Sequence, residues 1–411
     1  MDMRETLRRD AQTIIRRSIQ AVLPDEAVRR ALAHRQFPGR VVLIAAGKAA
    51  WQMARAARET LPVSWGVVIT KYGYSGGPIE NLTCFEAGHP VPDENSFRAT
   101  QAALDAVSGL SGEDTVVFLL SGGGSALFEQ PLVSGEELQN ITGQLLACGA
   151  DIVEINTIRK RLSAVKGGRF AQRCLPARVF SIVLSDILGD PLDMIASGPA
   201  CADSSTCADA AAVAVKYHLR LSETARGLLA RETPKALSNV ETVITGSVRE
   251  LCGAAAICCR ELGYEPILLT DRLCCEAREA GSFLASIARS HSGSEKSLAF
   301  LAGGETVVHL TGNGLGGRNQ EIALAAAAGI EGLSNVLVFS IGSDGTDGPT
   351  DAAGGMTDGG TLAELRERGL DIHAVLQEND AYHALKAVNG LIFTGATGTN
   401  VNDVSVVLIR A

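Results

Sequence analysis

The chain has few aromatic residues, no long apolar run and no metal-binding pattern of cysteines. Aromatic residues make up 4% of its 411 residues, whereas 46% are hydrophobic and 44 are glycines. Such a composition is typical of an α/β enzyme and disfavours a β-sandwich or a disordered chain. No apolar run approaches the roughly 18 residues that a membrane span needs, so we expect no membrane partner.

The ten cysteines include no CxxC motif and no Cys/His spacing of a zinc site. The N-terminal residues, MDMRETLRRD, lack the apolar core of a signal peptide. We therefore expect reduced thiols and a cytoplasmic location.

Acidic residues exceed basic ones, and the net charge of −9 disfavours nucleic acid as a partner. Between Glu154 and Asp186, however, there is no acidic residue at all. The basic residues in this stretch are Arg159, Lys160, Arg161, Lys166, Arg169, Arg173 and Arg178. A solvated helix face is one interpretation. The absence of neighbouring counter-charges favours the other, a local positive region for anionic substrates, with Lys160 and Lys166 as candidate anion binders.

Short apolar segments alternate with segments of helical pattern, which indicates a mainly parallel sheet covered on both faces. Two amphipathic helices, 3–21 and 25–35, come first. The predicted strands are 41–46, 66–70, 115–120 and 179–185, followed by 240–245, 266–270, 297–301, 336–342, 391–394 and 405–409. A helical region, 204–230, leads to a boundary near Pro234-Lys235. We expect two α/β domains, residues 1–235 and 236–411, with a ligand cleft between them.

The loops after the predicted strands carry the candidate chemistry, because ligands of such sheets bind outside the carboxyl ends of the strands. Lys48 follows the first strand and a glycine, and can reach a phosphate or carboxylate. Strand 115–120 ends in Ser121-Gly122-Gly123-Gly124-Ser125. Without side chains, this turn exposes N–H groups and a helix start that can cradle an anion, although it is not a P-loop and could be only a tight turn.

Asp186 and Asp190 follow strand 179–185, where two carboxylates could hold Mg²⁺, accept a proton from a substrate hydroxyl, or merely cap a helix. Asp344 lies in a similar Asp/Gly-rich loop, SDGTDGPTD, and could supply one metal ligand. His89 lies in GHPVP and is expected to be a fixed loop element rather than a catalytic base.

In the second half, Gly312, Gly314 and Gly317 formally satisfy the dinucleotide motif GxGxxG, but the next strand does not end in the acidic residue that this motif requires. Arg318 follows, where its guanidinium could bind a carboxylate or phosphate; a structural ion pair with a glutamate is the alternative. The loop TGATGTNVND offers uncharged donors, Thr399 and Asn400 among them, suited to nucleotide or sugar hydroxyls.

The ordered motifs GKAAWQMA, EAGHPVPDENS, LLSGGGSAL, NTIRKRLSAVKGGRFA, SDILGDPLDMIASGP, GGRNQEIAL, GSDGTDGPTDAAGG and TGATGTNVND closely resemble the two-domain glycerate kinases whose C-terminal half is the MOFRL domain. The resemblance spans nearly the whole chain. It implies a Rossmann-like N-terminal domain, a smaller α/β C-terminal domain and an active site in the cleft between them. It further implies ATP- and Mg²⁺-dependent phosphorylation of D-glycerate at its 2-hydroxyl.

The resemblance places Lys48, Arg318, Asp186 and Asp190 in catalysis, with Asp190 and Asp344 near the metal. The 121–125 turn, Thr399 and Asn400 would then help to bind the nucleotide. A homodimer is compatible with the resemblance, which leaves the oligomeric state open. Two alternatives stand beside the kinase: an NAD(P)H-dependent hydroxypyruvate reductase, which some members of the family are called, and a non-catalytic sugar- or nucleotide-binding protein.

Overall fold

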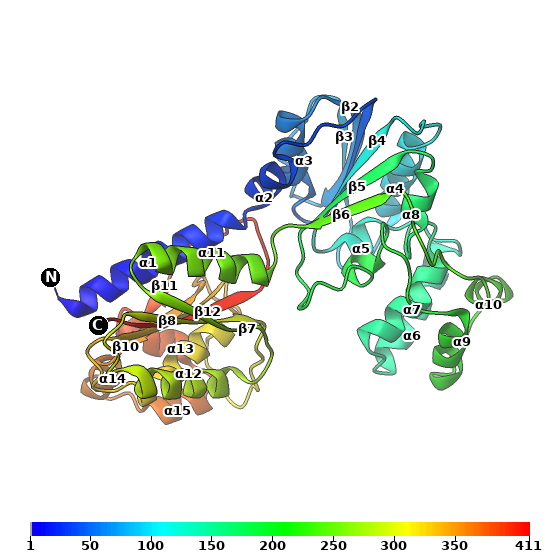
Figure 1. Cartoon of the computed structure of the whole chain (residues 1–411). Helices are drawn as coiled ribbons and strands as arrows, with labels where there is room; N and C mark the ends of the chain where they lie inside the picture. The colour runs from blue at the N-terminus through cyan, green and yellow to red at the C-terminus, as the bar shows by residue number, and fades with distance from the viewer. Residues whose placement is uncertain (1) are drawn as a thin grey trace. The chain divides into compact units, whose positions relative to one another are not determined.

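The computed structural model describes residues 2–411, which divide into two compact units. The N-terminal unit comprises Pro24–Ser185 and Asp190–Thr245. The C-terminal unit comprises residues 2–23, Asp186–Gly189 and Gly246–Ala411. Each unit contains one six-stranded sheet (Figure 1).

The sheet of the N-terminal unit is entirely parallel, with strand order β3-β2-β1-β4-β5-β6. Its strands are β1 (Val41–Ala46), β2 (Val63–Lys71), β3 (Leu82–Ala87), β4 (Thr115–Leu120), β5 (Arg178–Val183) and β6 (Val240–Ile244). This is the doubly wound order, in which the winding of the chain reverses between β1 and β4. Every residue of β1 and β4 is buried, which explains their unbroken apolar sequences. The expected Rossmann-like sheet is therefore confirmed.

Helices flank this sheet, and several of them form a core of their own. The helices are α2 (Pro24–Leu32), α3 (Ala50–Thr60), α4 (Glu94–Ala106), α5 (Gly124–Leu127), α6 (Gly135–Ala147), α7 (Ile152–Leu162), α8 (Arg169–Arg173), the 3₁₀ turn η1 (Ile195–Ser197), α9 (Cys207–Lys216) and α10 (Glu223–Leu229). Residues of α6, α7, α9 and α10 share an apolar cluster that includes Leu145, Ile158 and Leu228.

The sheet of the C-terminal unit is mixed, in the order β11-β10-β9-β12-β8-β7, and only β7 and β8 are parallel. Its strands are β7 (Glu265–Leu273), β8 (Leu298–Gly304), β9 (Val336–Gly342), β10 (Gly354–Asp358), β11 (Leu391–Ile392) and β12 (Asp403–Ile409). Its helices are α1 (Met3–Ala21), α11 (Val248–Glu261), α12 (Ala277–His291), α13 (Arg318–Gly329), α14 (Thr361–Glu367), α15 (Ile372–Gln377) and α16 (Ala381–Ala387). Figure 1 shows α1 and α11 on one face of this sheet and α12 and α13 on the other.

The division differs from the expected boundary at residue 235 in two respects. Strand β6 completes the first sheet, because Val179 to Val183 of β5 pair with Val240 to Ile244. Helix α1 packs on α11 of the C-terminal unit. Its buried Asp10 accepts hydrogen bonds from the Tyr264 hydroxyl (2.8 Å) and from Arg410 (2.5 Å). Contacts between residues so far apart in the sequence cannot be predicted from the local pattern of apolar residues.

Two strands were absent from the sequence-based expectation. Strand β3 lies at a sheet edge and is only partly buried, so it lacks a continuous apolar run. Strand β10 begins with Gly354-Gly355, residues of low strand propensity, and is held by pairing with β9 and β11.

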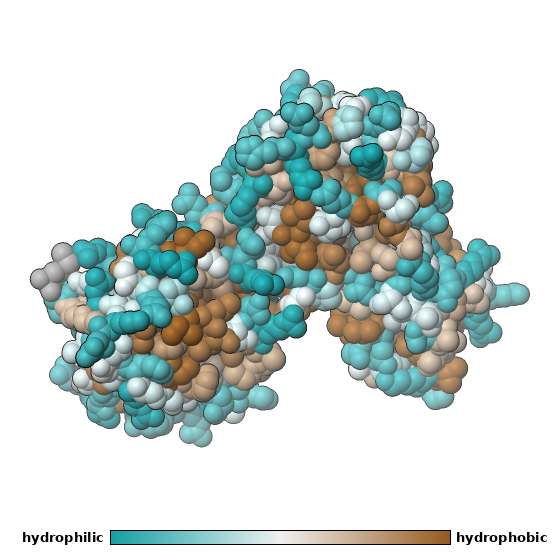
Figure 2. Space-filling view, viewed as in Figure 1, coloured by the Kyte–Doolittle hydropathy of each residue, from teal (hydrophilic) through white to brown (hydrophobic). Residues whose placement is uncertain are grey.

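Hydrophilic side chains are spread over the visible surface of each unit and are interrupted by smaller apolar groups (Figure 2). Among residues 2–411, no helix combines the length and the apolar character that membrane crossing requires.

Candidate active site

The candidate site of the N-terminal unit lies at the carboxyl ends of β1 and β4, the neighbouring strands between which the winding reverses. Ala46 pairs with Leu120, so the two strands end side by side. Gly47 follows with φ 128°, and a Cβ atom there would lie 2.2 Å from Oγ of Ser121. Only glycine fits, and the strand ends can therefore approach closely.

Hydrogen bonds lock these two loops together. The amide of Ala49 donates to Oγ of Ser121 (3.1 Å), and the amide of Lys48 donates to the carbonyl of Gly122 (2.9 Å). The buried serine thus organises the start of α3. The result is a fixed backbone at the point where doubly wound proteins bind their ligands.

The glycine turn itself offers unpaired donors. Gly123 adopts φ 85°, in the left-handed region, and α5 after it is a single four-residue turn. The contribution expected from the helix start is therefore small. The amides of Gly122 and Gly123, both partly exposed, donate to no acceptor within residues 2–411. An anion at this turn would meet backbone N–H groups rather than a helix dipole.

Two side chains lie over this turn. A Cβ atom on Gly123 would be 3.0 Å from Cδ2 and Nε2 of His89 and 3.2 Å from Cγ of Lys48. In the described part of the chain, neither the Lys48 ammonium nor the His89 ring forms a hydrogen bond or ion pair. Burial, together with the ammonium groups of Lys48 and Lys71, lowers the pKa of His89 below its ordinary value. A neutral imidazole and a free cation therefore face the same glycine turn.

The basic segment after Glu154 does not form an anion-binding surface at its two lysines, which corrects the expectation from missing counter-charges. Lys160 is buried between Asp203 (3.0 Å) and Asp193 (3.3 Å). Lys166 is buried beside Glu129 (3.3 Å), and burial lowers its pKa to about 8. The counter-charges come from distant parts of the sequence, and neither lysine keeps a free charge for a ligand.

Lys166 nevertheless supports the glycine turn from behind. Its ammonium donates to the carbonyls of Ser125 (2.9 Å) and Phe128 (3.1 Å). Arg159 donates to the same Ser125 carbonyl (2.9 Å). With its carbonyl oxygen held inward, Ser125 belongs to the framework of the turn.

The two aspartates after β5 fall on different sides of the division into units, Asp186 in the C-terminal unit and Asp190 in the N-terminal unit. Asp190 adopts φ 52°, a backbone conformation that is unfavourable for a non-glycine residue. Its Oδ1 is buried and has no hydrogen-bond partner among the described residues. A buried unpaired carboxylate oxygen is costly unless a ligand or cation satisfies it. Asp190 is therefore the stronger functional candidate of the two.

In the C-terminal unit, Arg318 at the start of α13 is paired rather than free. Its Nε and Nη2 bind the buried Asp403 at 2.5 and 3.1 Å, and its Nη1 lies 3.2 Å from Glu305. Although burial alone would lower the pKa of Arg318, the Asp403 contact raises it. The paired hydrogen bonds that we expected Arg318 to offer a ligand are made to Asp403 instead. Its Nη1 faces the half-exposed Glu305.

The Asp-rich loop after β9 is partly structural. Asp347 is buried and accepts hydrogen bonds from the amides of Asn319 (3.1 Å) and Gln320 (2.8 Å), so it caps α13. Burial raises the pKa of Asp347 to about 6. Asp344 is half-buried and accepts from the amide of Thr346 (3.0 Å), which leaves carboxylate capacity for a further ligand.

Some polar side chains of the 394–403 loop are buried and bonded within the protein, and others are exposed. Thr399 is buried and donates to the carbonyl of Val22 (2.9 Å), whereas Asn400 is exposed. Asn402 donates to Glu305 (3.0 Å), and its Oδ1 is buried without a partner among the described residues. Asn400 can still contact a ligand; the hydroxyl of Thr399 has an internal role.

No group of three or more His, Cys, Asp or Glu side chains with metal-binding geometry occurs in residues 2–411. This does not disfavour Mg²⁺, which is commonly held by one or two carboxylates plus substrate phosphates. The donor set of Asp190, with its unsatisfied buried oxygen, suits that ion.

The glycines of the GxGxxG match have a packing explanation. A Cβ atom at Gly312 would lie 2.3 Å from Cα of Glu378, and one at Gly317 would lie 2.3 Å from Cγ of Asp347. At Gly314 the nearest atom, Cβ of Asp380, would be at 2.5 Å. The space that a dinucleotide would need at these glycines is filled by the chain itself.

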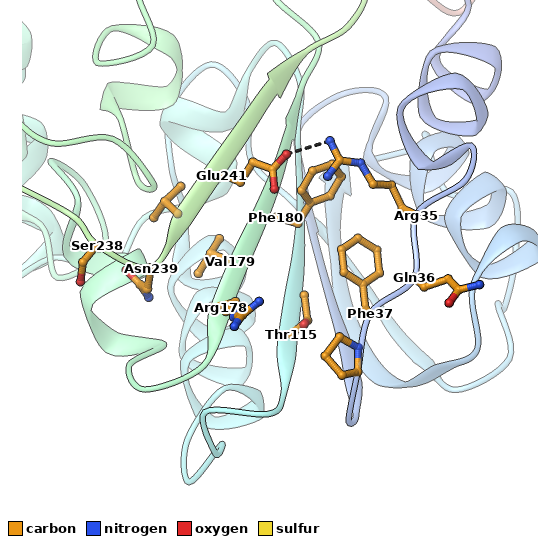
Figure 3. Close-up of a pocket in the computed structure, with 12 residues that line it drawn as sticks. Arg35, Gln36, Phe37, Thr115, Arg178, Val179, Phe180, Ser238, Asn239 and Glu241 are labelled. Atoms are coloured by element: carbon orange, nitrogen blue, oxygen red, sulfur yellow. Dashed lines mark ion pairs between the residues drawn. The ribbon is translucent and has the colours of Figure 1, made fainter.

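A cavity of about 480 Å³ opens at the opposite end of the first sheet (Figure 3). The amino-terminal ends of β4, β5 and β6 contribute Thr115, Phe180 and Glu241, and Glu241 pairs with Arg35 at 2.7 Å. Catalytic groups of such sheets come from the carboxyl ends, so this cavity is not the candidate active site.

Sequence reasoning undervalued His89 and missed Asp403. His89 was expected to serve as a loop element, yet its ring lies over Gly123. His89 follows β3, a strand that the sequence did not indicate, so its position near the carboxyl ends of the sheet could not be inferred. Asp403 closes the TGATGTNVND motif, but it lies 85 residues from Arg318, so local sequence carries no signal for the pair.

The geometry defines a two-unit α/β protein with a glycine turn of partly exposed amides at the switch point of a doubly wound sheet. A family model described as a domain of unknown function (DUF4147) matches residues 10–230, and the MOFRL family model matches residues 298–403. The D-glycerate 2-kinase of Thermotoga maritima is 52% identical over 413 residues, covering 98% of this chain and 99% of that protein. The crystal structure of a Thermotoga maritima glycerate kinase matches with a TM-score of 0.94, covering 98% of this chain and 100% of that chain.

Two further relatives are similar in sequence to this chain over most of their length. The glycerate 2-kinase of Pyrococcus horikoshii is 41% identical, covering 92% of this chain and 89% of that protein. An Agrobacterium vitis protein that carries the name hydroxypyruvate reductase is 40% identical over 97% of this chain and 94% of its own length. The chain belongs to the family of two-domain glycerate kinases with a C-terminal MOFRL domain.

We expect Arg318→Ala to lower the free energy of unfolding of the C-terminal unit by about 3 kcal/mol, because the buried Asp403 loses its counter-charge. Arg318→Lys should lose less. Urea denaturation followed by far-UV circular dichroism should report the change. Fluorescence should not, because both tryptophans, Trp51 and Trp65, lie in the N-terminal unit.

The control is Arg289→Ala, which removes an exposed arginine of α12 in the same unit. Equal transitions for Arg318→Ala and Arg289→Ala would contradict the structural role of the Arg318–Asp403 pair.

We expect Lys48→Met to raise the pKa of His89, because it removes a neighbouring positive charge while the ring stays half-buried. An NMR titration of the imidazole resonances measures this pKa. Lys296→Met, which removes an exposed lysine of the other unit, is the control. An unchanged His89 pKa in Lys48→Met would place the ammonium away from the ring.

Proposed function

We propose that this protein is an ATP- and Mg²⁺-dependent kinase that transfers the γ-phosphoryl group to the 2-hydroxyl of D-glycerate, giving 2-phosphoglycerate and ADP. The observation that carries the proposal is the set of unpaired groups at the switch point of the first sheet. Lys48, His89 and the amides of Gly122 and Gly123 lie close together there, and residues 2–411 offer no partner to the ammonium, the ring or the two amides. The kinase names of the 52% and 41% identical relatives support the same reaction.

Phosphoryl transfer requires positioning and positive charge rather than a covalent intermediate on the protein. In our proposal, the Gly122 and Gly123 amides donate to an anionic group of ATP or glycerate. Lys48 neutralises negative charge at the same turn as a compact point charge. The neutral His89 ring accepts a hydrogen bond from a substrate hydroxyl.

Mg²⁺, when bound, would neutralise phosphate charge, and Asp190 and Asp344 are the residues proposed to hold it. The remaining roles rest with the chain. Asp190 or Asp186 orients the reacting hydroxyl and takes its proton. Asn400 offers an exposed amide to the nucleotide.

Arg318 is proposed to act on the substrate through its Nη1 edge. The Nε edge is committed to the buried Asp403, which fixes the guanidinium plane. Glu305 is 47% exposed, and ion pairs of exposed groups are weak, so an anionic substrate can compete with it for Nη1. Arg318 thus binds Asp403 through Nε and the substrate through Nη1.

The reductase alternative draws on the name of the Agrobacterium vitis relative. Glycerate and hydroxypyruvate have nearly the same shape, so Lys48 and Arg318 suit both. The space beside Gly312, Gly314 and Gly317 is occupied by other residues of the chain, which disfavours a dinucleotide there.

We expect purified protein to form ADP and 2-phosphoglycerate from ATP, Mg²⁺ and D-glycerate, with ³¹P NMR identifying the product. Chelation with EDTA should stop turnover, and added Mg²⁺ should restore it. Lys48→Met should lower kcat/KM by about 10²-fold or more, whereas Lys296→Met should not. Hydroxypyruvate with NADH or NADPH is tested in parallel. Oxidation of the reduced cofactor without ADP formation would replace the kinase by the reductase, and the absence of both reactions would favour a binding protein.

A further inference from the structure

A second hollow in the N-terminal unit, of about 460 Å³, is lined by three arginines and no carboxylate. Arg169 and Arg173 come from α8, and Arg231 follows α10. None of the residues at the carboxyl ends of β1 and β4 lines it. It is therefore distinct from the candidate active site.

The charge at this hollow contrasts with the rest of the basic segment. Lys160 and Lys166 are neutralised by buried carboxylates, as described above. By contrast, Arg173 and Arg231 are exposed and form no ion pair with any carboxylate among residues 2–411. In a chain with a net charge of −9, such a concentration of unpaired positive charge indicates an anion from outside.

Arg169 is the fixed member of the three. Its Nη1 donates to the carbonyls of Ser163 (2.5 Å) and Arg161 (3.2 Å), which orients the guanidinium. Burial and the positive charges of Arg161 and Arg231 lower the pKa of Arg169 below its ordinary value, although the Asp203 carboxylate acts in the opposite direction. Arg169 and Arg231 line the same hollow, so an anion bound there would offset the repulsion between their positive charges.

The remaining lining gives the ligand its chemical class. Leu132, Ala164 and Leu228 form an apolar part beside the arginines, and Gln172 adds an uncharged amide. Guanidinium groups match the oxygens of a phosphate group with paired hydrogen bonds, and an apolar wall accommodates a short carbon skeleton. We propose that this hollow binds the dianionic phosphate group of a small phosphomonoester, or inorganic phosphate itself, at a site separate from catalysis.

Isothermal titration with inorganic phosphate and with glycerol 2-phosphate tests the proposal. The proteins carry Lys48→Met, so that phosphate binding at the glycine turn is weakened throughout. Arg231→Gln and Arg173→Gln should each weaken binding by about tenfold or more, because each removes a charged hydrogen-bond donor. Arg220→Gln removes an exposed arginine of the same unit that does not line the hollow, and should leave affinity unchanged.

Ionic strength is held constant, and circular dichroism confirms the fold of each variant. Tighter binding of glycerol 2-phosphate than of inorganic phosphate would identify a phosphomonoester as the ligand. Equal affinities would show that the hollow recognises the phosphate group and not the carbon skeleton. Affinities that agree between Arg231→Gln, Arg173→Gln and Arg220→Gln would overturn the proposal, as would the absence of binding by the parent protein.

Discussion

The candidate site depends on the close approach of two strand ends, at Gly47 and Ser121. A side chain on Gly47 would collide with Oγ of Ser121 at 2.2 Å, so the two loops can be joined by hydrogen bonds only because position 47 is glycine. This contact lies where the winding of the first sheet reverses, the region where such sheets leave room for a ligand. The position of Lys48 and that of the glycine turn follow from it, and the His89 ring lies over the same turn.

Electrostatic pairing then separates framework from function. Two buried lysines pair with carboxylates from distant segments, Lys160 with Asp203 and Lys166 with Glu129, and the partly exposed Arg318 pairs with the buried Asp403. Burying an unpaired charge would be strongly unfavourable, so the two lysine pairs hold the fold rather than a substrate, and the Asp403 pair fixes the guanidinium of Arg318 while its Nη1 edge faces Glu305. The Lys48 ammonium has no partner in the part of the chain that the structure describes, which makes it the clearest candidate for binding an anion.

The sequence was most informative where structure is local. The apolar runs 41–46, 115–120 and 336–342 are strands with the predicted bounds. The glycine turn and Lys48 could be placed because they follow such runs directly. What could not be predicted depends on contacts across the sequence: strand β6 joining the first sheet, the burial of Lys160 and the pairing of Arg318 with Asp403. The lack of acidic residues between Glu154 and Asp186 does not predict which carboxylates from other parts of the sequence will pair with the lysines of this stretch.

The most direct test of the central claim is whether the amides of Gly122 and Gly123 hold an anion. ¹⁵N-TROSY spectra of the deuterated protein, titrated with D-glycerate or with a non-hydrolysable ATP analogue, observe these two amides individually. We predict large, saturable shifts of both resonances with at least one ligand, and only small changes at Gly109, an exposed turn of the same unit. Unmoved Gly122 and Gly123 resonances under saturating amounts of both ligands would contradict the assignment of this turn as the anion cradle.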